Sequence, residues 1–254
     1  MAAETDAFLE DLISRIRREL GDGLVAVYLY GSYVSGGFDP GVSDLDLVAV
    51  TAADAGDLDL NGLDRVHRDV VSRGPEWSDR LEIVYVGREA LQSFRTSAGP
   101  LAVISPGEPF HLRTDRLTDW VQNWYLVRET GVTLYGPPAT TLVPTIDWSE
   151  FVAATARYAG EISTRNLAEA SAGTLAYEVL TMCRAFMTLQ TQTHPTKQEA
   201  ADWAREQLPD WAWLIDAVLR CRLSRGTVGF DDDESRAAAA ELVGLLVTRI
   251  SGRS

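Results

Sequence analysis

Residues 25–50, VAVYLYGSYVSGGFDPGVSDLDLVAV, constrain the fold more than any other stretch of this sequence. An apolar, β-branched run ends at Tyr30, a glycine-rich loop follows, and a second apolar run begins at Asp44 and Asp46. The pattern predicts two strands joined by a loop. Because residues i and i+2 of a strand project from the same face, we expect the two carboxylates side by side at the start of the second strand.

Carboxylates held this close repel each other unless a cation binds between them. Oxygen ligands that leave room for water and phosphate oxygens suit Mg²⁺. On the preceding turn, Gly31 and Ser32 offer backbone N–H groups and a hydroxyl to anionic oxygens. Each part alone is common in ordinary turns. Together, on neighbouring strands, they favour a site for nucleotidyl transfer.

A third strand is predicted within residues 80–91, RLEIVYVGREAL. Apolar side chains alternate along it, and Glu82 shares its face with Val84 and Val86. A glutamate in that position is expected to face either solvent or a cleft.

The composition limits which domain sizes and which kinds of ligand are expected for this chain. The 254 residues are 46% hydrophobic and 24% charged, so one large domain or two modest ones are expected. No apolar run approaches ~18 residues, and acids precede the first apolar residues, so we expect a cytoplasmic protein without a membrane span. A net charge of −14 speaks against nucleic-acid binding and fits a cationic small molecule. Cys183 and Cys221 are expected to be buried thiols.

The rest of the chain is predicted to be mainly helical, with one linker. Residues 92–118 are expected to form loops and short extended pieces, and His67 to be a solvated surface residue. The proline-rich stretch 136–145 is the expected linker. Helices are expected at residues 5–20, 61–73, 119–130, 147–170, 174–190, 196–208, 210–224 and 233–250. Thr196, with Glu199 three residues later, is the expected capping box at the start of the 196–208 helix. This pattern predicts an α/β domain over residues 1–145 and an all-α helical bundle over residues 146–254.

The stretch from Gly31-Ser32 to Ser43-Asp44-Leu45-Asp46 resembles the signature of the DNA-polymerase-β-like nucleotidyltransferase superfamily. The spacing is one residue longer than the commonest one, and the extra residue falls in the turn at 38–41, where an insertion is tolerated. The superfamily has a mixed sheet with flanking helices. Its third strand lies beside the strand with the two aspartates and carries a third carboxylate, which Glu82 matches.

Three further stretches resemble the aminoglycoside (3'')(9) adenylyltransferase family more specifically. They are LEIVYV around Glu82, RETGVTLYGP before the linker, and LTMCRAF…HPTKQEAADWAREQLP at residues 180–209. The resemblance implies a nucleotidyltransferase domain followed by a helical bundle, with the active site in the cleft between them. A cleft made by one chain needs no partner, so we expect a monomer.

The resemblance also implies roles at matched positions. Asp44, Asp46 and Glu82 would form the metal site for two Mg²⁺ ions that bridge the phosphates of ATP. Glu82 would also be the general base that takes the proton of the attacking hydroxyl. The remaining matches concern phosphate and acceptor binding. The triphosphate would be bound by Gly31, Ser32, Ser43, Arg184 and Lys197. The acceptor would contact Glu82 together with Tyr177 and Glu178. Lys197 is the only lysine in the chain.

The implied reaction is adenylylation of an aminoglycoside or aminocyclitol antibiotic. In dual-specificity members, an acidic residue and a tryptophan before the LTMCR helix contact streptomycin. Here that region reads NLAEASAGTLAYEVL, without tryptophan or aspartate, which favours spectinomycin over streptomycin. The alternatives are a nucleotidyltransferase that acts on a partner protein or another metabolite, and a non-catalytic protein that binds nucleotide or drug.

Overall fold

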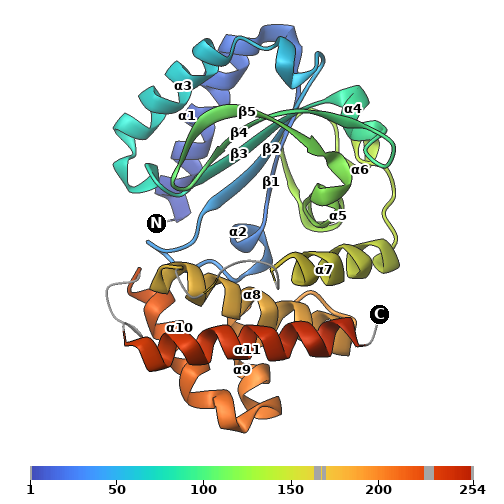
Figure 1. The fold of residues 1–254 in the computed structure, drawn as a ribbon. Helices are drawn as coiled ribbons and strands as arrows, with labels where there is room; N and C mark the ends of the chain where they lie inside the picture. The colour runs from blue at the N-terminus through green and yellow to red at the C-terminus, as the bar shows by residue number, and fades with distance from the viewer. Residues whose placement is uncertain (1, 163–166, 168–169, 226–231, 253–254) are drawn as a thin grey trace. The chain divides into compact units, whose positions relative to one another are not determined.

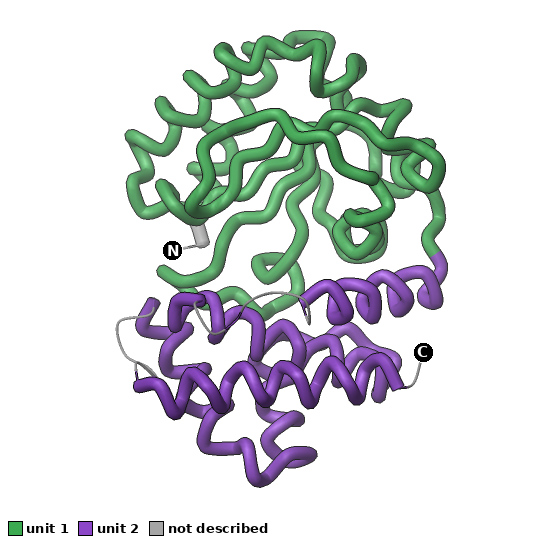
Figure 2. The backbone as a smooth tube through the Cα atoms, viewed as in Figure 1, with its two compact units in different colours: residues 1–146 green, residues 147–254 purple. Residues whose placement is uncertain are grey.

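The computed structural model describes residues 2–162, 167, 170–225 and 232–252. The chain divides into two compact units, residues 1–146 and residues 147–254, shown in different colours in Figure 2. Each unit has a hydrophobic core of its own.

The N-terminal unit alternates strands with helices (Figure 1). Its strands are β1 (Leu24–Tyr30), β2 (Leu45–Thr51), β3 (Leu81–Gly87), β4 (Ala98–Ser105), β5 (Glu108–Arg116) and β6 (Val132–Tyr135). Its helices are α1 (Ala2–Leu20), α2 (Ser32–Ser35), α3 (Leu60–Arg73), α4 (Arg88–Gln92), α5 (Val121–Thr130) and α6 (Ala139–Leu142).

Within the described residues of this unit, six strands form one sheet in the order β5-β4-β3-β2-β1-β6. β2 and β3 pair in parallel, whereas the other neighbours pair antiparallel. The parallel pair needs a crossover, and α3 supplies it. The predicted mixed sheet with flanking helices is therefore confirmed.

Both faces of the central strands are buried, because helices cover the sheet on two sides (Figure 1). The face that carries Leu47 and Ile83 packs on α1 and α3 in one hydrophobic cluster. The opposite face carries Tyr30, whose hydroxyl accepts a 2.8 Å hydrogen bond from Asn123 Nδ2 on α5. Central strands buried in this way leave their ends as the places where polar side chains can meet ligands.

The C-terminal unit is helical in its described residues. Its helices are α7 (Trp148–Ile162), α8 (Ala172–Thr191), α9 (Lys197–Gln207), α10 (Ala212–Leu223) and α11 (Asp233–Ser251). The predicted capping box at Thr196 and Glu199 is confirmed at the start of α9. The helix expected over residues 147–170 is described from Trp148 to Ile162, and most of 163–170 lies outside the described residues. No helix in the described ranges is both long and apolar enough to cross a membrane.

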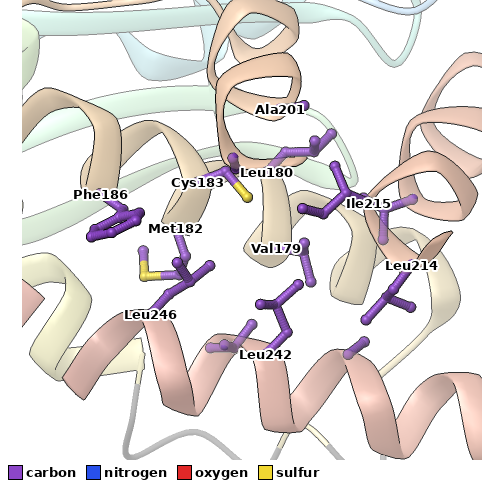
Figure 3. Packing of buried hydrophobic residues seen from close by; sticks show 14 of the residues in the cluster. Val179, Leu180, Met182, Cys183, Phe186, Ala201, Leu214, Ile215, Leu242 and Leu246 are labelled. Carbon is purple, nitrogen blue, oxygen red and sulfur yellow. The ribbon is translucent and has the colours of Figure 1, made fainter. Parts of the chain in front are cut away.

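Helix α8 is the centre of this unit's core. Its buried side chains pack against those of α9, α10 and α11, as Figure 3 shows for Leu180, Ile215 and Leu246. Cys183 and Cys221 belong to the same cluster, so the prediction that both thiols are buried is confirmed. Burial raises the pKa of the Cys183 thiol to about 12.

Residues 92–118 are more regular than expected. In place of loops and short extended pieces, they contain two full strands that form the β4–β5 hairpin, in which Leu101 pairs with Arg113. Pro100 lies within β4 and Pro109 within β5, so prolines that argue against regular structure are accommodated in paired strands.

His67 on α3 is buried rather than solvated, with an exposed fraction of 1%. Its Nε2 lies 2.7 Å from the Tyr85 hydroxyl, and its ring packs edge-on against Phe110 of β5. Burial lowers the pKa of His67 to about 4. The expectation of a surface histidine was wrong because it did not include the hairpin that supplies Phe110.

The expected linker is part of the N-terminal unit. It contains α6, whose Ala139 and Leu142 are buried. Arg128 Nη1 donates to the Thr140 carbonyl at 3.0 Å, and the Tyr28 hydroxyl donates to the Pro137 carbonyl at 2.8 Å. These contacts hold the segment against the sheet unit up to the boundary at residue 146.

The core around α8 generates a stability prediction. Replacing Leu246→Ala removes a fully buried side chain and leaves a cavity, which should cost about 2–5 kcal/mol of unfolding free energy. Leu245→Ala on the same helix removes a half-buried leucine and should cost about 1 kcal/mol. Urea unfolding followed by circular dichroism measures both, and equal losses would contradict the packing.

Candidate active site

The turn after β1 brings the backbone against an aspartate of β2. Gly31 has φ +74°, and a Cβ placed there would lie 2.0 Å from Oδ2 of Asp46. Any side chain at this position would therefore displace the carboxylate, in addition to straining the backbone. Ser32 follows as the first residue of α2, and the amide of Ser35 closes that turn onto the Gly31 carbonyl at 3.1 Å.

Strand register places two of the predicted carboxylates side by side. Asp46 is the partner of Tyr30 across β1–β2, and of Glu82 across the parallel pair β2–β3. Asp46 and Glu82 share the face of Val48 and Val84. The expectation that the strand of Glu82 lies beside the strand of Asp46 is confirmed.

Asp44 lies one residue before β2, which begins at Leu45. Its charge acts on Glu82 strongly enough to shift that residue's pKa, so the two carboxyl groups are close neighbours. Asp44, Asp46 and Glu82 are all half-buried. Three of the predicted residues thus gather where β2 and β3 begin, with Gly31 in contact with Asp46.

The carboxyl group of Glu82 has a raised pKa. Burial raises its pKa to about 7, with the negative charges of Asp44 and Glu108 adding to the rise and Arg113 opposing it. A carboxyl group that titrates near neutral pH can accept a proton from a substrate and release it again. The environment of Glu82 is therefore suited to general acid–base chemistry.

Ser43 is part of the loop's internal structure. It is 4% exposed, and its Oγ accepts a 2.9 Å hydrogen bond from the Asp39 amide. Its own amide donates to the Asp39 carbonyl at 2.9 Å. The structure thus gives Ser43 a role in shaping the loop before Asp44, and its contact with phosphate stays a prediction.

In the C-terminal unit, the structure brings together two of the predicted residues. The Nζ atom of Lys197 lies 4.2 Å from the ring centroid of Tyr177, an arrangement typical of a cation–π interaction. Tyr177 is 49% exposed, whereas its neighbour Glu178 is buried. The roles of these three residues at phosphate and acceptor stay predictions.

Arg184 lies on α8 and is half-buried. Its charge adds to the burial that lowers the pKa of His194 to about 4. His194 packs edge-on against Phe151 of α7, with ring centroids 5.3 Å apart. A neutral histidine therefore lies close to the guanidinium that the sequence analysis assigns to the triphosphate.

The donor chemistry fits Mg²⁺. Asp44 and Asp46 supply hard oxygen ligands, and like charges held at this spacing gain from a bound cation. Within the described ranges, no group of three or more His, Cys, Asp and Glu side chains converges closely enough to hold a metal by itself. Mg²⁺ is commonly bound by one or two carboxylates together with substrate phosphates, which the two aspartates can satisfy.

Sequence reasoning missed three residues near this site. Glu108 and Arg113 act on Glu82 from β5, and no local pattern predicts this because the β4–β5 hairpin was not expected. The third is Arg80, a buried arginine that contacts the loop before Asp44. Its position directly before an apolar strand was the one available signal.

Comparison with known families covers both units. Residues 10–92 match the family model described as nucleotidyltransferase domain. Residues 141–248 match the model described as aminoglycoside adenylyltransferase, C-terminal domain. An aminoglycoside (3'')(9) adenylyltransferase of Escherichia coli is 27% identical over 265 residues, which span 94% of this chain and 91% of that protein.

A solved structure has the same fold. It is spectinomycin adenyltransferase AAD(9) from Enterococcus faecialis, crystallised with ATP and spectinomycin, with a TM-score of 0.75. The match covers 96% of this chain and 98% of that chain at 17% identity. The two family models match in the expected order, and the E. coli relative spans nearly the whole chain. The chain is thus similar to a nucleotidyltransferase domain in its N-terminal part and to the C-terminal domain of aminoglycoside adenylyltransferases in its C-terminal part.

Proposed function

We propose that this enzyme transfers AMP from ATP to a hydroxyl of an aminocyclitol or aminoglycoside antibiotic and releases pyrophosphate. Spectinomycin is the favoured acceptor, and the reaction depends on Mg²⁺. The observation that carries the proposal is the register of Asp46 and Glu82 on neighbouring strands, with Gly31 against Asp46 and Asp44 close to Glu82.

Glu82 would bind the attacking hydroxyl and take its proton. The hydroxyl oxygen would then form a bond to the α-phosphorus of ATP, while the bond from that phosphorus to the bridging oxygen of the β-phosphate breaks. Pyrophosphate leaves with the electron pair of the broken bond. Glu82 must be ionised to accept the proton, and a pKa of about 7 leaves a large fraction of it ionised at neutral pH.

Asp44 and Asp46 would hold Mg²⁺. When bound, the metal supplies positive charge to the phosphate oxygens, which stabilises negative charge that develops during displacement. On the same proposal, Gly31, Ser32 and Ser43 orient the triphosphate from the sheet unit. Arg184 and Lys197 of the helical unit bind phosphate oxygens, and Tyr177 keeps the Lys197 ammonium at a fixed position through their cation–π contact.

Two observations support a cationic antibiotic as the acceptor. The net charge of −14 attracts cations, and Glu108 adds a half-exposed carboxylate near Glu82. The relatives indicate the class of acceptor: the E. coli protein is called an aminoglycoside (3'')(9) adenylyltransferase, and the E. faecialis structure contains spectinomycin. The segment 166–180, which contains neither tryptophan nor aspartate and runs into the first half of α8, supports spectinomycin over streptomycin.

Pyrophosphate release tests the proposal. ATP and Mg²⁺ are supplied with spectinomycin, with streptomycin or without acceptor, and we expect release of pyrophosphate with spectinomycin only.

Asp46→Asn tests the metal assignment. The substitution keeps the shape of the side chain and removes its charge, so it should abolish pyrophosphate release while the circular dichroism spectrum stays unchanged. Near-normal activity of Asp46→Asn would contradict the metal assignment. Release with neither drug in the wild type would exclude the proposed acceptors and leave a partner protein or another metabolite to be tested.

Glu82→Gln tests the general base. The variant should still bind ATP and spectinomycin but lose about 10²- to 10⁴-fold in kcat, since a positioned base contributes that much. Single-turnover kinetics with calorimetric binding measurements separate the two effects. Glu89→Gln, an exposed glutamate on α4, is the matched control and should leave kcat unchanged. Loss of ATP binding in Glu82→Gln would instead make Glu82 chiefly a metal ligand.

The raised pKa of Glu82 also predicts a pH dependence of stability without metal or nucleotide. From pH 4.5 to about 7 the native state keeps a proton that the unfolded state loses, so stability falls as pH rises. Glu82→Gln removes this effect. At about pH 8 the variant should be more stable than the wild type, and at about pH 4 the difference should vanish. Urea unfolding across this range measures it, and a constant difference would contradict the burial of the charge.

A further inference from the structure

Arg80 is a buried cation directly before β3. It is 4% exposed, although arginines are mostly found at protein surfaces. Its guanidinium carbon lies 4.5 Å from the ring centroid of Trp77 and 5.9 Å from that of Phe38. A charge taken out of water to this extent requires specific polar partners to offset its desolvation.

The polar partners lie on both sides of Asp44. Nε of Arg80 donates to the carbonyl of Ser43 at 2.8 Å, and Nη2 donates to the same oxygen. The carbonyl of Arg80 accepts a 2.8 Å hydrogen bond from the amide of Leu45. Ser43 and Leu45, the residues on either side of Asp44, are therefore both hydrogen-bonded to Arg80.

The aromatic side chains around Arg80 anchor the rest of the glycine-rich loop. Phe38 packs edge-on against Tyr33 with ring centroids 5.0 Å apart, and it lies 6.4 Å from Trp77. Trp77 in turn contacts Phe8 at 5.5 Å. The loop from Gly31 to Ser43 is thus fixed at Tyr33, at Phe38 and, through Arg80, at its end.

We propose that Arg80 is a positioning residue, which holds the backbone at Asp44 so that its carboxylate meets the metal beside Asp46. This inference rests on the proposed function, because it takes Asp44 as a metal ligand. The planar guanidinium suits this role because two of its N–H groups point at one carbonyl while its face lies on Trp77, a geometry that a lysine ammonium does not reproduce. A misplaced Asp44 would weaken metal binding first, before any effect on the general base.

Mn²⁺ binding tests this role without relying on turnover. Mn²⁺ replaces Mg²⁺ as the probe, and electron paramagnetic resonance measures its affinity for the full chain in the presence of a non-hydrolysable ATP analogue. Arg80→Gln should raise the Mn²⁺ dissociation constant about 10- to 100-fold, which is the usual effect of losing an outer partner of a ligand. Arg80→Lys keeps the charge, and we expect an intermediate increase.

Val70→Ala controls for lost stability. Val70 is 1% exposed in the core that also contains Trp77, so its truncation lowers the melting temperature while Arg80 and the Ser43 carbonyl are both retained. We expect unchanged Mn²⁺ affinity in this variant. Wild-type affinity in folded Arg80→Gln or Arg80→Lys would overturn the inference, as would an equal loss in Val70→Ala. A wild-type protein that binds no Mn²⁺ would overturn the metal site itself, which is a different result.

Discussion

Crowding of three half-buried carboxyl groups, those of Asp44, Asp46 and Glu82, is the constraint on which the site in the sheet unit depends. Parallel pairing of β2 and β3 holds Asp46 next to Glu82, and the loop before β2 brings Asp44 near them. Without a bound cation this arrangement costs stability: burial is the main cause of the raised pKa of Glu82, and the negative charges of Asp44 and Glu108 add to it. The hydrogen bonds of the sheet and its two-sided core offset that cost, so the carboxylates are in place before any ligand arrives.

Local patterns were enough to predict much of the fold. β-branched runs indicated the first three strands, and apolar periodicity indicated the helices of both units. The capping box at Thr196 and Glu199 was predicted because its signal lies within four residues. The position of Asp46 beside Glu82 also followed from the sequence, once the resemblance to a known family placed their strands side by side.

Features that depend on contacts between distant segments could not be predicted in this way. His67 is buried under Phe110, which lies much later in the chain, on β5. Arg80 bonds to the Ser43 carbonyl, 37 residues earlier, and nothing in the sequence around either residue indicates the pair. Residues 136–145 look like a linker because proline-rich segments often are, yet tertiary contacts hold them to the sheet unit.

The contact between Lys197 and Tyr177 has a practical consequence. Since Lys197 is the only lysine, its ammonium is the one side-chain amine in the chain. An amine-directed acylating reagent therefore has a single side-chain target, which lies against the ring of Tyr177. The proposed binding of phosphate at Lys197 would therefore be measured in the wild-type chain as protection of this one amine from acylation.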